Sequence, residues 1–416
     1  MSQLQDPLAV KGIRQSVVIT NNLSTIDQNQ QLLVRFPNLG SNDVIVPGTT
    51  KLSFTISLTS TDANKTLVQN IGRAVVSKTT IRISGREVMS IDDSDVYYCY
   101  LDCWKTRWER QNAQYQGIDV SEDRNTTKLR VGAGDADEDV PEDKAIADVY
   151  GNRFFIPLDF ELLESCMPFH QSSLGDRLEY ELTFNSYRRV IQSTDASASY
   201  KIENISLEFD TVTAPDLARQ IRNQYSSKIA ILYERVLRHR KIKVDKSDTL
   251  WNININTPAR SMKGILLLFE DPSGTRDTEN FYNPKITKVE MTIEGVPNQL
   301  YSQGMRVYQQ WDEARKFLSG NSKRSPAINA VIKDIQIPNV SLDSYYTSKF
   351  CLALDLRTTD DDQLHGSGRQ IENASEGITL QIAKKAEAAG NLNIYVYLIM
   401  DAQLNIENGR IANALY

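Results

Sequence analysis

The sequence predicts an all-β protein made of two similar β-sandwiches in tandem. Two observations lead to this fold class: apolar and polar residues alternate with a period of two over most of the chain, and the same succession of strand and helix signals occurs twice. The chain has 416 residues, of which 40% are hydrophobic and 24% charged. This length and composition suit a folded protein of two or three domains and disfavour disorder.

The alternating segments are short and separated by turn residues. Each predicts an antiparallel strand with one face in a core and the other in solvent. Turn signals stand between them at 47–48, 271–274 and 294–295. The clearest segments are Leu52–Leu58, Leu178–Phe184, Ile205–Phe209, Val289–Ile293, Ile378–Ile382 and Ile394–Leu398.

The repeat is most visible where a strand is stopped by a glycine. Thr80–Gly85 and Glu290–Gly295 are both short alternating strands, and their glycines stand 210 residues apart. We expect both glycines to adopt a positive φ in a turn, which costs other residues more.

A helix with one apolar stripe should follow in each copy. Asp92 or Asp93 can cap the first helix. The stripe residues of the first copy are Tyr97, Leu101, Trp104 and Trp108, and those 210 positions later are Val307, Trp311, Ala314 and Leu318. An aromatic stripe at helical spacing indicates core packing.

The second part of the repeat sets the predicted domain limits. Phe155–Phe160 corresponds to Phe350–Leu356, and two alternating strands follow in each copy. We therefore predict one sandwich in residues 1–213 and another in 228–416. Residues 214–227 form the linker, with a short helix from Pro215 to Arg222.

The first copy carries an insertion at about 111–150. Acidic residues outnumber basic ones between Asp119 and Asp148, and glycines interrupt the segment. This pattern predicts a solvated surface loop, which could decorate an outer surface.

About eight strand candidates per copy is the number of a jelly roll, so we predict two tandem eight-stranded jelly rolls with a few short helices. This arrangement resembles the double jelly-roll major capsid proteins of DNA viruses, a lineage that includes nucleocytoplasmic large DNA viruses, virophages and Polinton-type elements. The residues that carry the resemblance are Phe154–Phe160, with its Phe-x-Pro-Leu strand, Leu178–Leu182, and Tyr282–Pro284 before the second glycine-stopped strand.

The resemblance implies a structural role without catalysis. In the family, three chains form a pseudo-hexagonal capsomer, and capsomers tile an icosahedral shell with penton and minor capsid proteins. The resemblance places the chain in the virion, after synthesis in the host cytoplasm and assembly in the nucleus or cytoplasm. It implies no catalytic, cofactor or metal site.

Two other functions stay open. A carbohydrate-binding or attachment protein would need exposed loop aromatics, for which Tyr345–Tyr346 and Phe281–Tyr282 are candidates, although packing at the sandwich edge is the favoured interpretation. A double-jelly-roll glycan hydrolase would need convergent carboxylates. The acidic clusters Asp92–Asp95 and Asp360–Asp362 fit a helix start and a solvated loop better.

The remaining signals concern thiols and charge. Cys99, Cys103, Cys166 and Cys351 are too few for a disulfide scaffold, favour a reducing compartment, and are predicted to be core thiols rather than metal ligands. The chain shows no signal peptide and no apolar run long enough for a membrane span.

The net charge of −6 disfavours wrapping of nucleic acid. The basic stretch Arg235–Lys243 could touch a genome on the inner face of a shell, but its alternation favours a strand with one solvated face. The arm Val10–Arg14 could reach a neighbouring subunit or the lumen.

Overall fold

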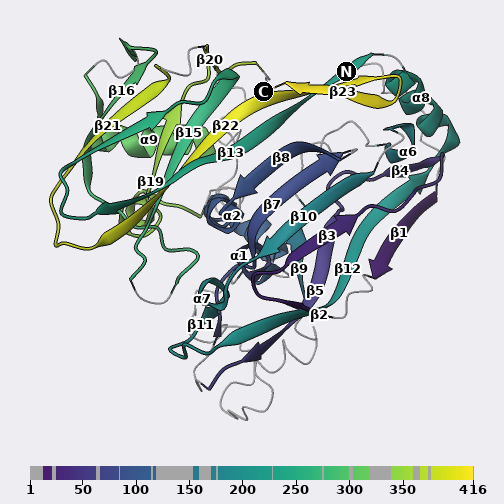
Figure 1. The fold of residues 1–416 in the computed structure, drawn as a ribbon, viewed down its shortest axis with the longest axis horizontal. Helices are drawn as coiled ribbons and strands as arrows, with labels where there is room; N and C mark the ends of the chain where they lie inside the picture. Colours follow the sequence, from purple (N-terminus) through teal and green to yellow (C-terminus); the bar gives the residue numbers. More distant parts are fainter. Residues whose placement is uncertain are drawn as a thin grey trace, which may run out of the picture.

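Two β-sandwiches lie side by side in the computed structural model (Figure 1). The structure describes residues 13–20, 25–61, 66–83, 85–113, 116–118, 153–158, 170–174, 177–226, 228–273, 276–298, 303–318, 339–358, 366–372 and 376–415.

The first sandwich contains two large antiparallel sheets. One sheet has the order β1–β12–β5–β9, with bounds Ile13–Thr20, Ser199–Thr213, Lys51–Thr59 and Arg153–Pro157; β2 (Thr25–Asp27) and β4 (Asp43–Ile45) also pair with β12. The other has the order β3–β10–β7–β8, with bounds Gln31–Arg35, Leu178–Phe184, Val76–Ile83 and Arg86–Asp92. A small ribbon joins β6 (Thr66–Leu67) to β11 (Ile191–Gln192).

The second sandwich repeats this arrangement. One sheet has the order β13–β22–β15–β19, with bounds Ile229–Asp245, Asn391–Glu407, Ala259–Glu270 and Cys351–Asp355; β20 (Arg369–Ile371) and β23 (Arg410–Leu415) extend it. The other has the order β14–β21–β16–β17, with bounds Leu250–Ile255, Ile378–Lys384, Ile286–Ile293 and Val296–Pro297; β18 (Met305–Arg306) also pairs with β16.

The two strand orders match position by position, because β1, β12, β5 and β9 take the places that β13, β22, β15 and β19 take in the second copy. The second sheets match in the same way. Among the described residues, no ladder joins a strand before β12 to one after it. The prediction of two tandem jelly rolls in an all-β chain is confirmed. The two turn glycines also behave as predicted, with φ values of 71° at Gly85 and 78° at Gly295.

Helices lie between the strands of both sandwiches. The helix predicted after each glycine-stopped strand is present, as α2 and α9, and the linker helix is present as α8, which begins at Pro215 as predicted. The helices are α1 (Ile71–Ala74), α2 (Ser94–Cys103), α3 (Arg107–Asn112), α6 (Gln171–Leu174), α7 (Tyr187–Val190), α8 (Pro215–Ser226), α9 (Val307–Leu318) and α11 (Leu342–Thr347). Within the described part of the chain, none of them is long and apolar enough to cross a membrane.

The apolar stripe of the first helix is shorter than predicted. α2 ends at Cys103, and Trp108 belongs to α3, which starts anew because Thr106 and Glu109 form a capping box. Asp93 is the N-cap of α2, as expected, but its side chain makes no capping bond, since the residue sits in the left-handed region at φ 47°. In α9, Val307 is 45% exposed, so this member of the stripe is not core.

One prediction about the strands is wrong in an informative way. Ile394–Leu398 alternates in sequence, yet every residue from Leu392 to Ala402 in β22 is buried. The face expected in solvent lies instead against the first sandwich. The residues Gly264–Phe269 of the neighbouring strand β15 are all buried as well. These strands have both faces covered, which an isolated sandwich would not show.

Several sequence predictions fall outside the described residues. They concern the acidic insertion from Asp119 to Tyr150, the cluster Asp360–Asp362, Cys166, and the arm from Val10 to Gly12. Of the arm, Arg14 is described and its guanidinium donates to Asp210 of β12, with Nε 2.8 Å from Oδ2. Cys99, Cys103 and Cys351 are buried free thiols, as predicted.

Candidate assembly site: the seam between the two sandwiches

The two sandwiches meet along a buried contact, called the seam below, formed mainly by β13, β22 and the loop after β15 on one side and by β8, α2 and α7 on the other. Figure 1 shows the long strands β13, β22 and β23 extending from the second sandwich across the first. Two buried tyrosines fix this placement. The Tyr233 hydroxyl donates to the Val88 carbonyl at 3.0 Å, and the Tyr397 hydroxyl donates to the Asp93 carbonyl at 2.8 Å.

A four-residue ion network lies at the centre of the seam. Asp95 of α2 is 1% exposed. Its Oδ2 accepts from Arg189 Nε at 2.9 Å and from Arg276 Nη1 at 2.5 Å. Glu270 also faces both guanidinium groups, at 3.4 Å and 3.8 Å. Because Asp95 and Arg189 belong to the first sandwich and Glu270 and Arg276 to the second, the network joins the two.

The ionisation of these groups follows from their neighbours. Burial alone would raise the pKa of Asp95, but the two guanidinium charges outweigh it and hold that pKa below its usual range. The pKa of Glu270 is lowered for the same reason, with help from the Tyr395 hydroxyl, which donates to it. Both carboxylates are therefore ionised in the folded protein at neutral pH, and the four charges sum to zero.

A second polar cluster crosses the seam near α3. Arg110 Nη2 is 2.6 Å from Glu279 Oε1, and both side chains are less than a tenth exposed. Lys349 also donates to the Glu279 carbonyl, and the Tyr100 hydroxyl donates to the Lys349 carbonyl at 3.1 Å. The Arg110–Glu279 and Tyr100–Lys349 contacts link one sandwich to the other, while the Lys349–Glu279 contact lies within the second sandwich.

Aromatic rings fill the space between these polar clusters. Trp104 and Trp311 stack at a centroid distance of 5.7 Å, and Tyr100 meets Phe281 edge to face at 4.7 Å. Both pairs join one ring from each sandwich. Such pairs add to the stabilisation that burial of their large apolar surfaces gives.

The C-terminal hairpin closes the far end of the seam. Arg86 of β8 donates to the Ala412 carbonyl at 2.6 Å. Gly409, at φ 71° in the turn between β22 and β23, donates its N–H to the Tyr225 carbonyl of α8 at 3.2 Å. The contact therefore runs from α7 to α8.

Buried ion networks contribute little net stability, because desolvation offsets most of the Coulomb gain. The seam joins two such networks to directional tyrosine bonds and stacked rings. We infer that it holds the two sandwiches in one fixed relative orientation rather than as independently moving domains.

The structure places the sequence candidates as follows. Asp95 is a seam residue, while its neighbour Asp92 bonds to Arg238 at 3.2 Å and to Lys78 at 3.2 Å. Tyr345 and Phe281 are buried, which confirms the packing interpretation for these two aromatics, whereas Tyr346 and Tyr282 are partly exposed. Sequence reasoning missed Arg189, in the four-residue helix α7, and Arg276, in the loop after β15, because neither segment has a periodicity that marks a buried charge.

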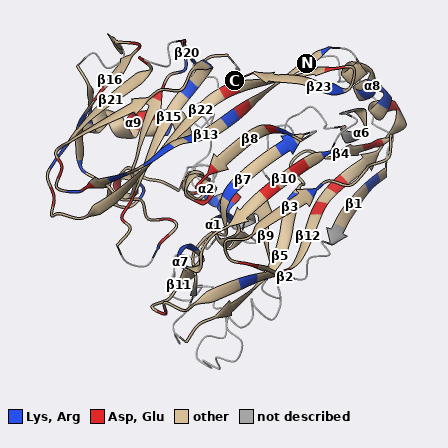
Figure 2. Cartoon of the chain, viewed as in Figure 1, with Lys and Arg blue, Asp and Glu red and all other residues tan. Residues whose placement is uncertain are grey.

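The basic stretch forms part of β13, as the alternation predicted. Val236 is buried, while Ile242 and Val244 pack against the core. Arg238 is neutralised by Asp92 and Asp93, and Lys241 lies over the Tyr395 ring at 4.7 Å. Figure 2 shows blue and red segments interspersed on both sandwiches rather than one large basic face.

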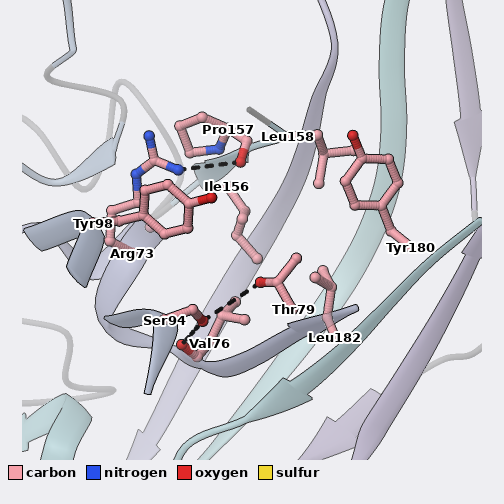
Figure 3. Close-up of a pocket in the computed structure, with 11 residues that line it drawn as sticks. Arg73, Val76, Thr79, Ser94, Tyr98, Ile156, Pro157, Leu158, Tyr180 and Leu182 are labelled. Atoms are coloured by element: carbon pink, nitrogen blue, oxygen red, sulfur yellow. Dashed lines mark hydrogen bonds between the residues drawn. The ribbon is translucent and has the colours of Figure 1, made fainter. Parts of the chain in front are cut away.

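A small cavity inside the first sandwich offers no room for a substrate. Its volume is about 20 Å³, enough for one water molecule. Figure 3 shows Arg73 on one side, donating to the Pro157 carbonyl at 3.4 Å, and Tyr180 and Leu182 on another. In the part of the chain that the structure describes, no cluster of three or more His, Cys, Asp or Glu side chains could hold a metal.

The strand order, its duplication and the seam together define a double jelly-roll protein. Solved structures with this fold include a PBCV-1 virus capsid model, with a TM-score of 0.61, 12% identity and 98% of each chain covered. The Faustovirus major capsid protein gives a TM-score of 0.58 at 9% identity, covering 96% of this chain and 91% of that one. The mavirus major capsid protein gives 0.55 at 11% identity, covering 96% and 90%.

No protein-family model and no curated protein sequence matches the chain. The chain therefore has the fold of the viral double jelly-roll capsid proteins, at sequence identities that establish the fold alone.

Proposed function

We propose that this chain is a non-enzymatic major capsid protein that forms a pseudo-hexagonal homotrimer. The observation that carries the proposal is a contact between the two sandwiches of one chain. The strands that correspond to its two sides are exposed elsewhere on the molecule. Within the chain, β13 of the second sandwich packs on β8 of the first. In the first sandwich β1 takes the place that β13 takes in the second, and in the second sandwich β17 takes the place that β8 takes in the first.

Both of these equivalent strands are exposed. On β1, Ile13 is 66% and Val18 is 59% exposed; on β17, Val296 is 61% exposed. Exposed apolar side chains on an edge strand favour contact with another chain. If β1 of one copy packs on β17 of the next, the contact inside the chain is repeated between chains.

Such a contact is head to tail, so it closes into a ring when the rotation allows. Three chains supply six sandwiches around one axis, which is the outline that tiles hexagonally. Each chain contributes residues 1–213 and 228–416 as its two units, joined by 214–227. The seam supports this role because a tile needs a fixed angle between its sandwiches.

A closed icosahedral shell also has five-fold vertices that hexagonal tiles cannot occupy. The proposal therefore includes a penton protein and minor capsid proteins as partners, with the chain located in the virion after synthesis in the host cytoplasm and assembly in the nucleus or cytoplasm. Weak contact with the genome on the inner face would involve the exposed Arg240 and Lys243 of β13. Such binding to DNA should weaken steeply with salt.

The test is the mass in solution, measured by light scattering. We expect a particle of three times 47.1 kDa, seen as a hexagonal outline in negative-stain images. Val18→Asp and Val296→Asp should each lower the mass to that of a monomer, because each places a charge in one half of the contact.

A head-to-tail contact makes a stricter prediction for the mixture of these two variants. Each variant retains the half that the other lacks, so mixing them should give a heterodimer of twice 47.1 kDa. Leu250→Asp is the matched control, since Leu250 is 47% exposed on β14, at the opposite end of the sheet from β17. A wild-type monomer at all concentrations, or variants that stay trimeric, would refute the proposal.

A further inference from the structure

A polar cavity of about 420 Å³ opens at the α7 end of the seam. It lies between α7 of the first sandwich and the loop that follows β15 in the second. The volume falls in the range of small-molecule sites. Its charged lining residues are Arg188, Arg189, Arg276, Glu270, Asp271 and Asp277. Three positive and three negative groups leave the lining with no net charge, which disfavours a simple anion or cation as ligand.

Most of these charges are neutralised within the protein, but two are not. Glu270 faces the guanidinium groups of the seam, and Asp271 is bonded by Lys246. Arg188 is exposed and bonds only the Tyr187 hydroxyl, at 3.2 Å; among the described residues it has no carboxylate partner. Asp277 is also exposed and has no cationic partner there. The cavity thus offers one open set of donors and one open set of acceptors.

A neutral group deeper in the cavity is also unused. Asn393, at the start of β22, is 7% exposed and lines the cavity, yet its side-chain amide makes no hydrogen bond to any described residue. Arg189 Nη2 is likewise buried without a partner in the described part of the chain. Buried polar groups are normally paired, so an unpaired amide beside an open cavity indicates a group that a ligand or water completes.

The lining contains one aromatic ring as well. Tyr282 is half-buried, and the Lys246 ammonium group lies 4.7 Å from its ring centre. An amide, a guanidinium group, a carboxylate and an aromatic ring together suit a ligand whose groups both donate and accept hydrogen bonds along a partly apolar body. Sugar hydroxyls and the C–H faces of a sugar ring have these properties.

We propose that this cavity is a binding site for a neutral saccharide. Asn393 bonds a sugar hydroxyl through both ends of its amide, and Arg188 and Asp277 bond hydroxyls at the mouth. The site goes beyond the capsid role, because it gives the capsomer a glycan-binding activity of its own. Since the cavity lies within one chain, its occupation does not depend on trimer formation.

The test starts with the full-length protein, labelled and applied to an array of neutral and acidic glycans. A neutral oligosaccharide that binds is then titrated against the protein by saturation-transfer NMR. Asn393→Leu keeps the side-chain size and removes the amide, and Arg188→Ala removes the open guanidinium group. We expect each variant to weaken binding about tenfold or more, the effect of one or two lost hydrogen bonds.

Matched controls are Asn252→Leu on β14 and Arg219→Ala on α8, both exposed and away from the cavity; these should bind as the wild type does. Light scattering on every variant separates loss of binding from loss of assembly, so a failed saccharide site and a failed capsid proposal are distinguishable. Absence of any glycan ligand, equal binding by all variants, or displacement of the sugar by phosphate, sulfate or free amino acids at equal concentration would each overturn the inference.

Discussion

Replacement of Arg276 by methionine tests whether the seam network behaves as its geometry requires. The four charges of Asp95, Arg189, Glu270 and Arg276 sum to zero in a site where Asp95 is 1% exposed. Arg276→Met keeps most of the side-chain volume but leaves the site with a net negative charge. Removing one partner of a buried ion pair costs about 3–5 kcal/mol. Because Arg189 still bonds Asp95, we expect the lower end, about 3 kcal/mol.

A second substitution separates the charge effect from packing. Glu270→Gln restores neutrality to the Arg276→Met site and preserves an acceptor for the Tyr395 hydroxyl. The double variant should therefore be more stable than Arg276→Met alone, although it carries one more change. We expect a coupling free energy of about 1–2 kcal/mol in this direction. Arg219→Met, whose ion pair with Asp216 is exposed on α8, should cost less than about 0.5 kcal/mol.

The assay is urea unfolding at pH 7 and fixed protein concentration, since assembly makes stability depend on concentration. The near-ultraviolet circular dichroism of the stacked Trp104–Trp311 pair reports on the seam directly. Far-ultraviolet dichroism reports on the sheets. The reasoning is refuted if Arg276→Met unfolds at the same urea concentration as Arg219→Met, or if the effects of Arg276→Met and Glu270→Gln simply add.

Two other predictions concern acid sensitivity and backbone packing. His170 is buried, and its Nε2 lies 3.1 Å from the Ser41 carbonyl oxygen, which also accepts a hydrogen bond from Arg222 of α8. Burial, and to a smaller extent the positive charge of Arg222, lower the pKa of His170 below 6.5. The unfolded chain therefore takes up the proton first, so stability should fall as the pH drops below about 6.5, and His170→Gln should flatten this slope in thermal unfolding between pH 7 and 5. In Gly72→Ala the new Cβ would collide with the Phe155 carbonyl oxygen, which belongs to the backbone and cannot move easily. We therefore expect the free energy of unfolding in urea to fall by about 2 kcal/mol or more. In the control Gly48→Ala the new Cβ meets no atom, but the residue has φ 71°, so the substitution should cost about 1 kcal/mol.

Much of the fold follows from local features of the sequence. Alternation in Leu178–Phe184 and Ile378–Ile382 corresponds to β10 and β21, and the turn glycines at 85 and 295 have the positive φ that stops a strand. These features can be predicted because side-chain direction in a strand has a fixed period and because only glycine adopts such a φ without cost. The repeat then gave the duplication without any knowledge of contacts.

The seam could not be predicted in the same way. In β22, Tyr395 and Tyr397 alternate with apolar residues as a half-solvated strand would, and only the placement of the first sandwich shows that they are buried. Asp95 is at once a first-turn acidic residue and a buried ion partner, and its sequence context reveals only the first property.

The sequence by itself determined what depends on neighbours a few residues apart: the strands, the turns, most of the helix positions and their twofold repetition. Tertiary structure alone decided which strand faces predicted to lie in solvent are covered, and which charged side chains pair with one another. Asp95 and Arg276 are 181 residues apart, and Arg189 and Glu270 are 81 apart. Contacts of such separation arise only when two complete sheets pack together, and local periodicity carries no information about the partner that a face will meet.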